Sequence, residues 1–338
     1  MSISADFLKS IYKRPGYLDS DSLVDLLDQA MSASELQDTD MRPKDRRGLP
    51  GGIVYFNNEQ HSSKPVIVIP DLHARMDFII AVMQFEIFKG VSVLKALEDN
   101  MCIVICVGDG FHGEARVRDR WYKAFEEYTG DFYKHKAMDE EMRESLGLME
   151  MVLHLRIHYP DNFFFLKGNH ENIANEGIEG NYPFGKFVRE GEMVTYWVRR
   201  FLGDEAFKGI YLYEKTLPIL AVCNEFIVTH AEPARYYAED DIRNCYLNPE
   251  VIYAFTWTDN NAAEDNSVKD ILEMFFPNNG STFMFGGHRP IRGKYNLRAG
   301  GRYIQLHNPD DYVVAVVREA RSFNIEKDIH VIPRKTIR

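Results

Sequence analysis

From residue 65 onward, short apolar runs alternate with longer segments in which apolar positions recur at helical spacing. The short runs are rich in β-branched and aromatic residues and end at Gly, Pro, Asp or Asn, which is typical of strands. They comprise Val66–Ile69, Ile103–Val107, Phe163–Leu166, Ile219–Val222, Phe226–Thr229, Phe283–Phe285, Tyr303–Leu306 and Val313–Val317. Because they are apolar almost throughout, they predict a sheet covered on both faces. We therefore expect an α/β fold, as a layered α/β/β/α sandwich or a related arrangement.

The segments with helical spacing predict helices between several of these strands. They are Phe78–Phe88, Arg118–Ile157 with a break near Gly130, and Gly191–Leu202. The last two fall within longer stretches, 117–160 and 172–215, that we interpret as helical insertions. The first stretch is acidic and the second contains several aromatic residues. Each insertion is either a helical layer packed on the sheet or a cap that shapes a substrate pocket.

The first 64 residues lack this alternation of strands and helices. Leu23–Met31 has helical spacing, with Ser20 or Ser22 available as its N-cap. Asp38–Gly52 is polar and rich in Pro and Gly, which indicates a linker or an ordered arm. The expected organisation is an N-terminal extension over 1–64, one domain over 65–320 with the two insertions, and a C-terminal tail over 321–338.

Composition narrows the class of protein. The chain has 338 residues, of which 45% are hydrophobic and 27% charged, as in ordinary soluble globular proteins. Its formal net charge of −11 argues against a nucleic acid or an anionic membrane as the main partner. It contains neither an apolar run of membrane-spanning length nor a signal-peptide pattern. The four cysteines form no CxxC pair, and three lie in apolar runs, so we expect free thiols and a cytoplasmic location.

Five of the predicted strands run directly into residues that can bind a metal ion. Their ends carry Asp71-Leu72-His73, Gly108-Asp109, Gly168-Asn169-His170-Glu171, His230 and His288. Each of these could be an ordinary turn on its own, but loops at strand C-termini converge on one crevice in α/β sheets. Asp, Asn and His together suit Mn, Fe or Zn better than Ca, and the absence of Cys argues against a structural zinc site. The ordered set therefore predicts one shared metal centre.

The order of these ends resembles the signature of the calcineurin-like metallophosphoesterase superfamily: Asp-x-His, Gly-Asp, Gly-Asn-His-Glu and two later histidines. It is most similar to the branch that contains the serine/threonine phosphoprotein phosphatases and the symmetrical diadenosine tetraphosphatases. Two further segments, Leu217-Pro218-Ile219 and Thr256-Trp257-Thr258-Asp259, also resemble that branch. The resemblance covers roughly residues 65–318 and does not extend to the first 64.

The resemblance implies a dinuclear site of two divalent metal ions, Mn, Fe or Zn, about 3.5–4 Å apart with a bridging hydroxide as the nucleophile. Asp71 and His73 would bind the first metal, and Asp109 would bridge both. The second metal would be bound by Asn169, His230 and His288. The resemblance assigns His170 the role of general acid beside the leaving oxygen. The implied partner is a phosphorylated substrate: a phosphoprotein, a nucleotide or a small phosphate ester.

The second motif departs from the pattern Gly-Asp-x-x-Asp-Arg-Gly of the phosphoprotein phosphatases. His112 stands where an Asp would orient the catalytic histidine, and Gly113 stands where an Arg would grip phosphate. We expect His112 to be part of the catalytic site. Glu114 lies near enough in sequence to hold an imidazole, although not at the matching spacing.

Other residues are candidates for the missing phosphate contact. Arg116 and Arg289 are the main candidates, with Arg75 and Arg235 as further ones, although for each arginine alone a surface ion pair is the simpler interpretation. His307 ends a later strand and is either a ligand or phosphate contact or an ordinary loop histidine.

Three functions are compatible with this pattern. The first is hydrolysis of a phosphate ester by a phosphatase-like enzyme, and the second is hydrolysis of a nucleotide or dinucleotide pyrophosphate. The third is a metal-bearing scaffold that binds a partner protein, which the changes at His112 and Gly113 bring into consideration. The complete ligand set favours an enzyme.

Overall fold

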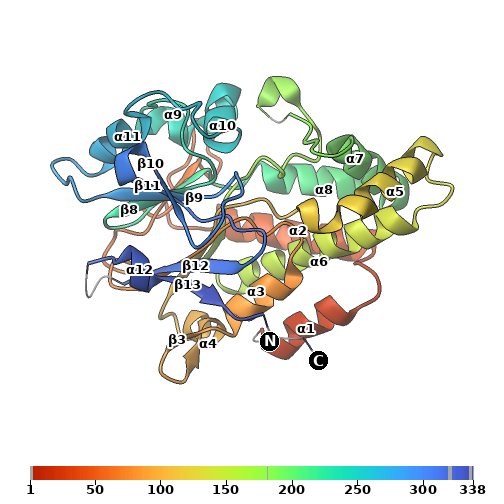
Figure 1. The fold of residues 1–338 in the computed structure, drawn as a ribbon, viewed down its shortest axis with the longest axis horizontal. Coiled ribbons are helices and arrows are strands. Elements are labelled where there is room, and N and C mark those ends of the chain that lie inside the picture. Colours follow the sequence, from red (N-terminus) through yellow and green to blue (C-terminus); the bar gives the residue numbers. More distant parts are fainter. Residues whose placement is uncertain (1–2, 181, 319–321, 335–336, 338) are drawn as a thin grey trace.

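The computed structural model describes residues 3–180, 182–318, 322–334 and 337. Two mixed sheets face each other, and helices cover the outer face of each (Figure 1). One sheet has the order β1 (Ile53–Tyr55), β7 (Leu220–Val222), β8 (Phe226–Thr229), β9 (Phe283–Gly286), β11 (Tyr303–Gln305) and β10 (Asn296–Arg298). The other has the order β13 (Ile329–Ile332), β12 (Tyr312–Val317), β2 (Val66–Ile69), β5 (Ile103–Cys106) and β6 (Phe163–Phe165). A small hairpin pairs β3 (Glu86–Phe88) with β4 (Val91–Ser92).

The apolar strand sequences are explained by burial on both faces. In β2, Val66 and Val68 face the core between the two sheets, whereas Ile67 and Ile69 face the helices. Successive side chains of a strand point to opposite faces, so a strand between two apolar layers must be apolar at every position. The predicted α/β/β/α sandwich is therefore confirmed.

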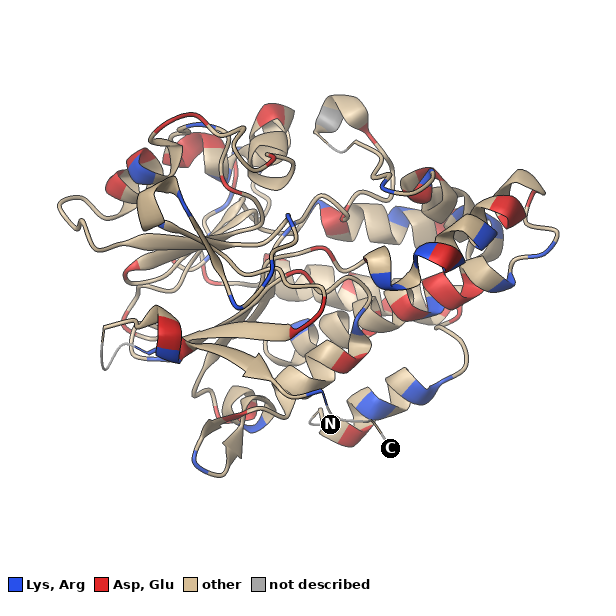
Figure 2. Cartoon of the chain, in the orientation of Figure 1, with Lys and Arg blue, Asp and Glu red and all other residues tan. Residues whose placement is uncertain are grey.

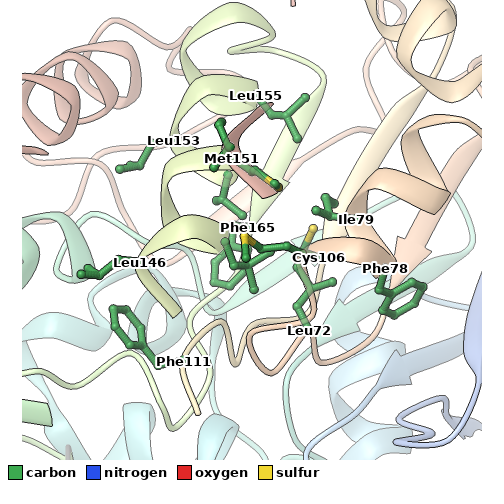
Figure 3. Close-up of a cluster of buried hydrophobic side chains, with 14 of the residues drawn as sticks. Leu72, Phe78, Ile79, Cys106, Phe111, Leu146, Met151, Leu153, Leu155 and Phe165 are labelled. Atoms are coloured by element: carbon green, nitrogen blue, oxygen red, sulfur yellow. The ribbon is translucent and has the colours of Figure 1, made fainter. Parts of the chain in front are cut away.

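Most of the described helices belong to the helical layer on the outer side of the five-stranded sheet. They are α1 (Ala5–Lys13), α2 (Ser20–Glu35), α3 (Met76–Met83), α4 (Val93–Glu98), α5 (Arg118–Thr129), α6 (Lys136–His158), α7 (Glu190–Phe201) and α8 (Gly203–Glu214). Some of them, such as α1, α5 and α7, pack on other helices of this layer. Figure 3 shows part of this core, where Ile79 of α3 and Met151 of α6 lie near Cys106 and Phe165 of the sheet.

The outer face of the six-stranded sheet is covered by α9 (Glu239–Arg243), α10 (Pro249–Thr256) and α11 (Ser267–Phe275). Figure 2 shows acidic and basic residues interspersed along α5 and α6. Among the described residues, no helix is both long enough and apolar enough to span a membrane.

Two local expectations were wrong. The helix expected over Phe78–Phe88 ends at Met83, and Glu86–Phe88 forms β3 instead, because the chain reverses at Gly90, whose φ of 76° suits glycine. The N-cap of α2 is Asp19, whose carboxylate accepts the backbone N–H of Ser22 at 2.9 Å. An ionised cap also interacts favourably with the helix dipole.

The segment before residue 65 contributes directly to the packed layers. β1 pairs in parallel with β7, while α1 packs on α3 and α6 and α2 packs on α6 and α8. Gly52 passes so close to the backbone of Ile242 that a Cβ would lie 2.3 Å from its carbonyl oxygen. At the other end, the described part of the tail over 321–338 forms α12 (Ile325–Asp328) and β13, which pairs with β12. Residues 321, 335–336 and 338 of that expected tail lie outside the described residues.

Candidate metal centre

The sheet topology brings the predicted ligands together. β2, β5 and β6 are mutually parallel in one sheet, and β8 and β9 are parallel in the other, so their C-terminal ends meet at one edge of the sandwich. All six residues predicted to bind metal lie in this cluster and are buried: Asp71, His73, Asp109, Asn169, His230 and His288. Sequence reasoning found them because each directly follows a strand.

One half of the cluster surrounds Asn169. Nδ1 of His230 lies 3.0 Å from the carbonyl oxygen of Val107, so its N–H donates there and Nε2 keeps a lone pair. That Nε2 faces Asn169 Oδ1 at 3.1 Å and Asp109 Oδ2 at 3.5 Å. His288 Nδ1 also lies 3.0 Å from Asn169 Oδ1. Lone pairs on these nitrogen and oxygen atoms point toward one another, which is unfavourable unless a cation lies between them. The atoms are therefore the kind of ligand set that binds a cation.

The other half surrounds His73. Its Nδ1–H donates to the carbonyl oxygen of His112 at 3.1 Å, which leaves the lone pair on Nε2. Nε2 faces two carboxylate oxygens at 3.6 Å, one from Asp109 and one from Glu114. Oδ2 of Asp109 therefore lies between the two halves, 3.6 Å from His73 and 3.5 Å from His230.

The backbone at the strand ends is held in an uncommon conformation. His73, Asp109 and His288 have φ angles of 43°, 54° and 64°, in the left-handed region that L-residues seldom adopt. Such conformations cost about 1–3 kcal/mol each and cluster at functional sites. Two glycines make the close packing possible, because a Cβ on Gly168 would lie 2.2 Å from Asp109 Oδ1 and one on Gly287 would lie 1.7 Å from Asp71 Oδ2.

Glu171 ties two of these loops together. Its carboxylate accepts the backbone N–H groups of Gly168, Asp109 and Gly110 at 2.7, 2.9 and 2.7 Å. Asp109 Oδ1 in turn accepts the backbone N–H of His170 at 3.0 Å. The last residue of the Gly-Asn-His-Glu motif thus positions the loops after β5 and β6, rather than facing a metal itself.

The electrostatics of the cluster fit divalent cations. Burial lowers the pKa of His230 and of His288 to about 3, so both imidazoles are neutral at pH 7, the form that binds metal. Burial, together with the carboxylates of Asp71 and Glu171, raises the pKa of Asp109 well above its usual range. Like charges this close are relieved either by protonation of one carboxyl or by a bound cation, and the neutral imidazoles beside them supply further ligands for a cation.

Unsatisfied atoms point to the same conclusion. Among the described residues, Asp71 Oδ2 and His307 Nδ1 are buried without a hydrogen-bond partner. Buried polar atoms almost always have partners, and each of these is a ligand type for Mn, Fe or Zn. The residues present therefore fit the metal ions that the sequence implies.

His170 stands at the edge of the cluster. Its side chain is 12% exposed, more than that of Asp109 or His73 beside it, and its Nε2 lies 3.8 Å from Asp109 Oδ2. Burial, followed by the neighbouring imidazoles of His112 and His73, lowers its pKa well below 6.5. The ring of Phe184 covers it at a centroid distance of 4.3 Å.

His112 packs beside His170, with ring centroids 5.0 Å apart. The ring of His112 also stacks on Trp121 at a centroid distance of 4.9 Å, and its Nε2 lies 3.4 Å from a carboxylate oxygen of Glu190 at the start of α7. Although burial opposes it, the hydrogen bond with His112 lowers the pKa of Glu190, so this carboxylate is ionised. His112 therefore connects His170 to a charge on the second insertion.

The four candidate arginines are all engaged with protein groups. Arg116 pairs with Glu144 at 2.7 Å and lies 3.3 Å from the carbonyl oxygen of Ala74. Arg289 pairs with Asp259 and Arg235 with Glu250. Arg75 is buried, and its guanidinium donates to the backbone carbonyls of Asp71, Leu72, Asn308 and Pro309. Arg75 thus holds two loops in place and has no free face for a phosphate.

A comparison with protein families shows which family this fold belongs to. A family model described as calcineurin-like phosphoesterase matches residues 64–315. The match spans every strand end that carries a predicted ligand. The chain belongs to the calcineurin-like phosphoesterase family. The resemblance drawn from the motifs is therefore confirmed, and this calcineurin-like phosphoesterase is a metal-dependent hydrolase.

Two solved structures are similar to this calcineurin-like phosphoesterase. A protein serine/threonine phosphatase from Saccharomyces cerevisiae matches with a TM-score of 0.58 and 15% identity, over 98% of this chain and 96% of that chain. A cold-active protein-tyrosine phosphatase from a psychrophilic Shewanella matches with a TM-score of 0.49 and 12% identity, over 84% of this chain and 83% of that chain. At such identities the likeness to the yeast protein shows a common fold.

Sequence reasoning missed two residues that contact the site of this phosphoesterase. Lys186 forms an ion pair with Glu114 at 3.0 Å, and Glu190 contacts His112. Both belong to the second insertion, where no motif marks them. Their pattern in the sequence is that of ordinary surface charges, and only the folded chain shows that they face the centre.

Proposed function

We propose that this chain hydrolyses a phosphate ester at a centre of two divalent cations, with Asp109 between them and His170 as the general acid. Mn, Fe and Zn all suit the ligand set. The observation that carries the proposal is the meeting of ligand atoms from five strand ends. His73 and His230 face the carboxylate of Asp109. The amide oxygen of Asn169 faces His230 and His288. A structural zinc site would be closed by its own ligands, whereas this cluster borders the partly exposed side chain of His170, which is not one of the assigned ligands.

The roles divide between cations and protein. When bound, two such cations lower the pKa of a coordinated water and neutralise charge on the phosphate. Asp71 and His73 would hold one cation, and Asn169, His230 and His288 would hold the other. The neutral imidazoles and the rigid strand ends keep these ligands in place before the substrate arrives.

His170 would donate its proton to the departing alkoxide. The low pKa of the buried ring makes its protonated form a strong acid, and a bound phosphate dianion would favour protonation on arrival. We propose that His112 is a positioning residue, which holds the ring of His170 and links it to the ionised Glu190. This arrangement takes the place of the Asp that the phosphoprotein phosphatases have at position 112.

We propose that residues 184–190 act as a cap over the centre. Phe184 covers His170, Lys186 contacts Glu114 and Glu190 contacts His112. Of the two interpretations of the insertion over 172–215, these contacts favour a cap for this part of it.

Arg116 and Arg289 are proposed as the rim arginines: their guanidinium groups would leave their carboxylate partners and bind the substrate phosphate instead. The catalytic unit is proposed to span 65–320.

A second substrate class, a nucleotide or dinucleotide pyrophosphate, is favoured by one observation. Gly113 has no side chain with which to grip a phosphate, and Glu114 adds a negative charge beside His73. A substrate whose reacting phosphate carries a single negative charge would be repelled less by this carboxylate than a phosphate dianion would be.

We also propose a reducing, cytoplasmic location, which the four free and buried cysteines favour.

The proposal is tested by release of p-nitrophenol from p-nitrophenyl phosphate with added Mn²⁺. Asp109→Asn should lower kcat by roughly 1,000-fold, because cations supply several kcal/mol of charge stabilisation. Asp119→Asn, at an exposed position of α5, is the matched control and should keep wild-type activity. Wild-type activity in Asp109→Asn would refute the proposed centre. Parallel panels of phosphopeptides and dinucleotide polyphosphates then separate the two substrate classes by kcat/KM.

A further inference from the structure

His307 lies within the cluster, although it belongs to no motif of the family signature. It follows β11, a strand whose end carries none of the six ligands assigned from the sequence. The residue is fully buried, and its Nδ1 lies 3.6 Å from Asp71 Oδ2. One ligand atom from each of Asp71, His73 and His307 lies within 4.8 Å of the other two.

The hydrogen bonding of His307 defines which nitrogen is available. Nε2 lies 3.1 Å from Oε2 of Glu114, and a carboxylate can only accept, so the N–H must be on Nε2. In the neutral ring, Nδ1 then presents its lone pair to Asp71. The distance of 3.6 Å between Nδ1 and Asp71 Oδ2 is too long for a hydrogen bond, and both atoms lack a partner among the described residues.

The same arrangement recurs at two histidines already assigned. His73 and His230 each give one N–H to a backbone carbonyl oxygen and turn the other nitrogen to a carboxylate oxygen at 3.6 and 3.5 Å. Two ligands of one cation with bonds of about 2.1 Å in tetrahedral geometry lie roughly 3.4 Å apart. The separations in this cluster match that value.

Glu114 is itself held in place. Its other oxygen accepts Lys186 at 3.0 Å, and Lys186 belongs to the cap segment 184–190. Histidine ligands commonly donate their second N–H to a carboxylate, which fixes the ring and raises its basicity. Here Glu114 accepts from both Lys186 and His307, so this carboxylate connects the cap segment to the part of the centre that contains Asp71 and His73.

We propose that His307 is a ligand of the cation held by Asp71 and His73, and that Glu114 is its positioning partner. This inference rests on the proposed dinuclear function. It gives the first cation two imidazole ligands, the same number that His230 and His288 give the second. It also assigns Glu114, which stands in the altered second motif, to metal binding rather than to phosphate binding.

Two variants of His307 separate the role of each nitrogen. The amide of Gln lies near the position of Nε2, so His307→Gln can keep the contact with Glu114 while it loses the ligand. The amide of Asn lies near the position of Nδ1, so His307→Asn can keep a weak ligand oxygen and loses the contact. His61→Asn, at another buried histidine that bonds to Asn58, is the matched control.

The readout is the number of Mn²⁺ ions per chain and the affinity of each, measured by titration calorimetry and elemental analysis, with thermal unfolding to confirm folding. The wild type and His61→Asn should bind two ions. His307→Gln should weaken one site by more than about 100-fold, with a smaller loss in His307→Asn, and Glu114→Gln should weaken it by roughly 10- to 100-fold. Two ions at wild-type affinity in both His307→Gln and Glu114→Gln would overturn this inference alone. Fewer than two ions in the wild type would overturn the dinuclear function as well.

Discussion

The site is built from two regions that differ in how they are held. Asp71, Asp109, Asn169, His230 and His288 follow strands that both sheets fix by hydrogen bonds and by burial. The region around His170 is held instead by side chains from loops and from the insertion: His112, Glu114, Lys186 and Glu190. A change at a strand end would therefore remove a proposed metal ligand, whereas a change in the second region would remove the proposed acid, His170, or alter how it is positioned.

This difference suggests a division of tasks. The strand ends would hold the metal ligands in place, and this arrangement does not depend on which substrate binds. The loops and the proposed cap would decide how the substrate approaches and how its leaving group is protonated. Within one family, the second region can therefore vary while the first remains complete, as it does here with His112, Gly113 and Glu114. We expect graded effects across the second region, in the following order.

The largest effect in the second region is expected at His170. His170→Asn should lower kcat by roughly 100- to 10,000-fold on an alkyl phosphate, whose alkoxide needs a proton to leave. The loss on p-nitrophenyl phosphate should be much smaller, because p-nitrophenolate leaves without protonation. Steady-state kinetics on both substrates measure this ratio, with His158→Asn at the exposed end of α6 as the control. Equal losses on both substrates would remove His170 from the role of acid.

An intermediate effect is expected at Glu190. Glu190→Gln should lower kcat on the alkyl phosphate about tenfold, because a hydrogen bond to a charged group contributes about 1.5 kcal/mol. Glu192→Gln, at an exposed position of the same helix, should change nothing. If Glu190 acts through His112 and His170, Glu190→Gln should cause no further loss in the His170→Asn background. An additive loss in the double variant would show that Glu190 acts by another route.

The smallest effect is expected at the rim arginines. Arg116→Gln and Arg289→Gln should each raise KM by about fivefold without lowering kcat, because partly exposed ion pairs contribute at most about 1 kcal/mol. Arg199→Gln removes a similar exposed ion pair, with Asp204, and should leave KM unchanged. An unchanged KM in both rim variants would show that neither arginine reaches the substrate.

The sequence predicted the strands and their ends well, for a physical reason. A strand between two apolar layers must be apolar at every position, so Val66–Ile69 and Phe226–Thr229 were found with correct bounds. β1 was missed because Ile53–Tyr55 has only three residues in a polar segment, and its partner β7 lies far along the chain. The helix predicted over Phe78–Phe88 was too long because the apolar periodicity continues into the hairpin that follows Met83.

The contacts around His170 could not be predicted in the same way. Glu190 is separated from His112 by 78 positions, and His307 from Glu114 by 193. No motif marks Glu190, and the end of a predicted strand marks His307 only as one of two alternatives, a ligand or phosphate contact or an ordinary loop histidine. Their meeting depends on how α7 and the loop after β11 pack on the sandwich, which is a property of the whole fold.

Anomalous X-ray diffraction from crystals grown with Mn²⁺ tests the central claim most directly. The account predicts two peaks about 3.5–4 Å apart, with the carboxylate of Asp109 between them. One peak should lie beside Asp71 and His73, and the other beside Asn169, His230 and His288. A single peak, or two peaks that do not share Asp109, would contradict the account.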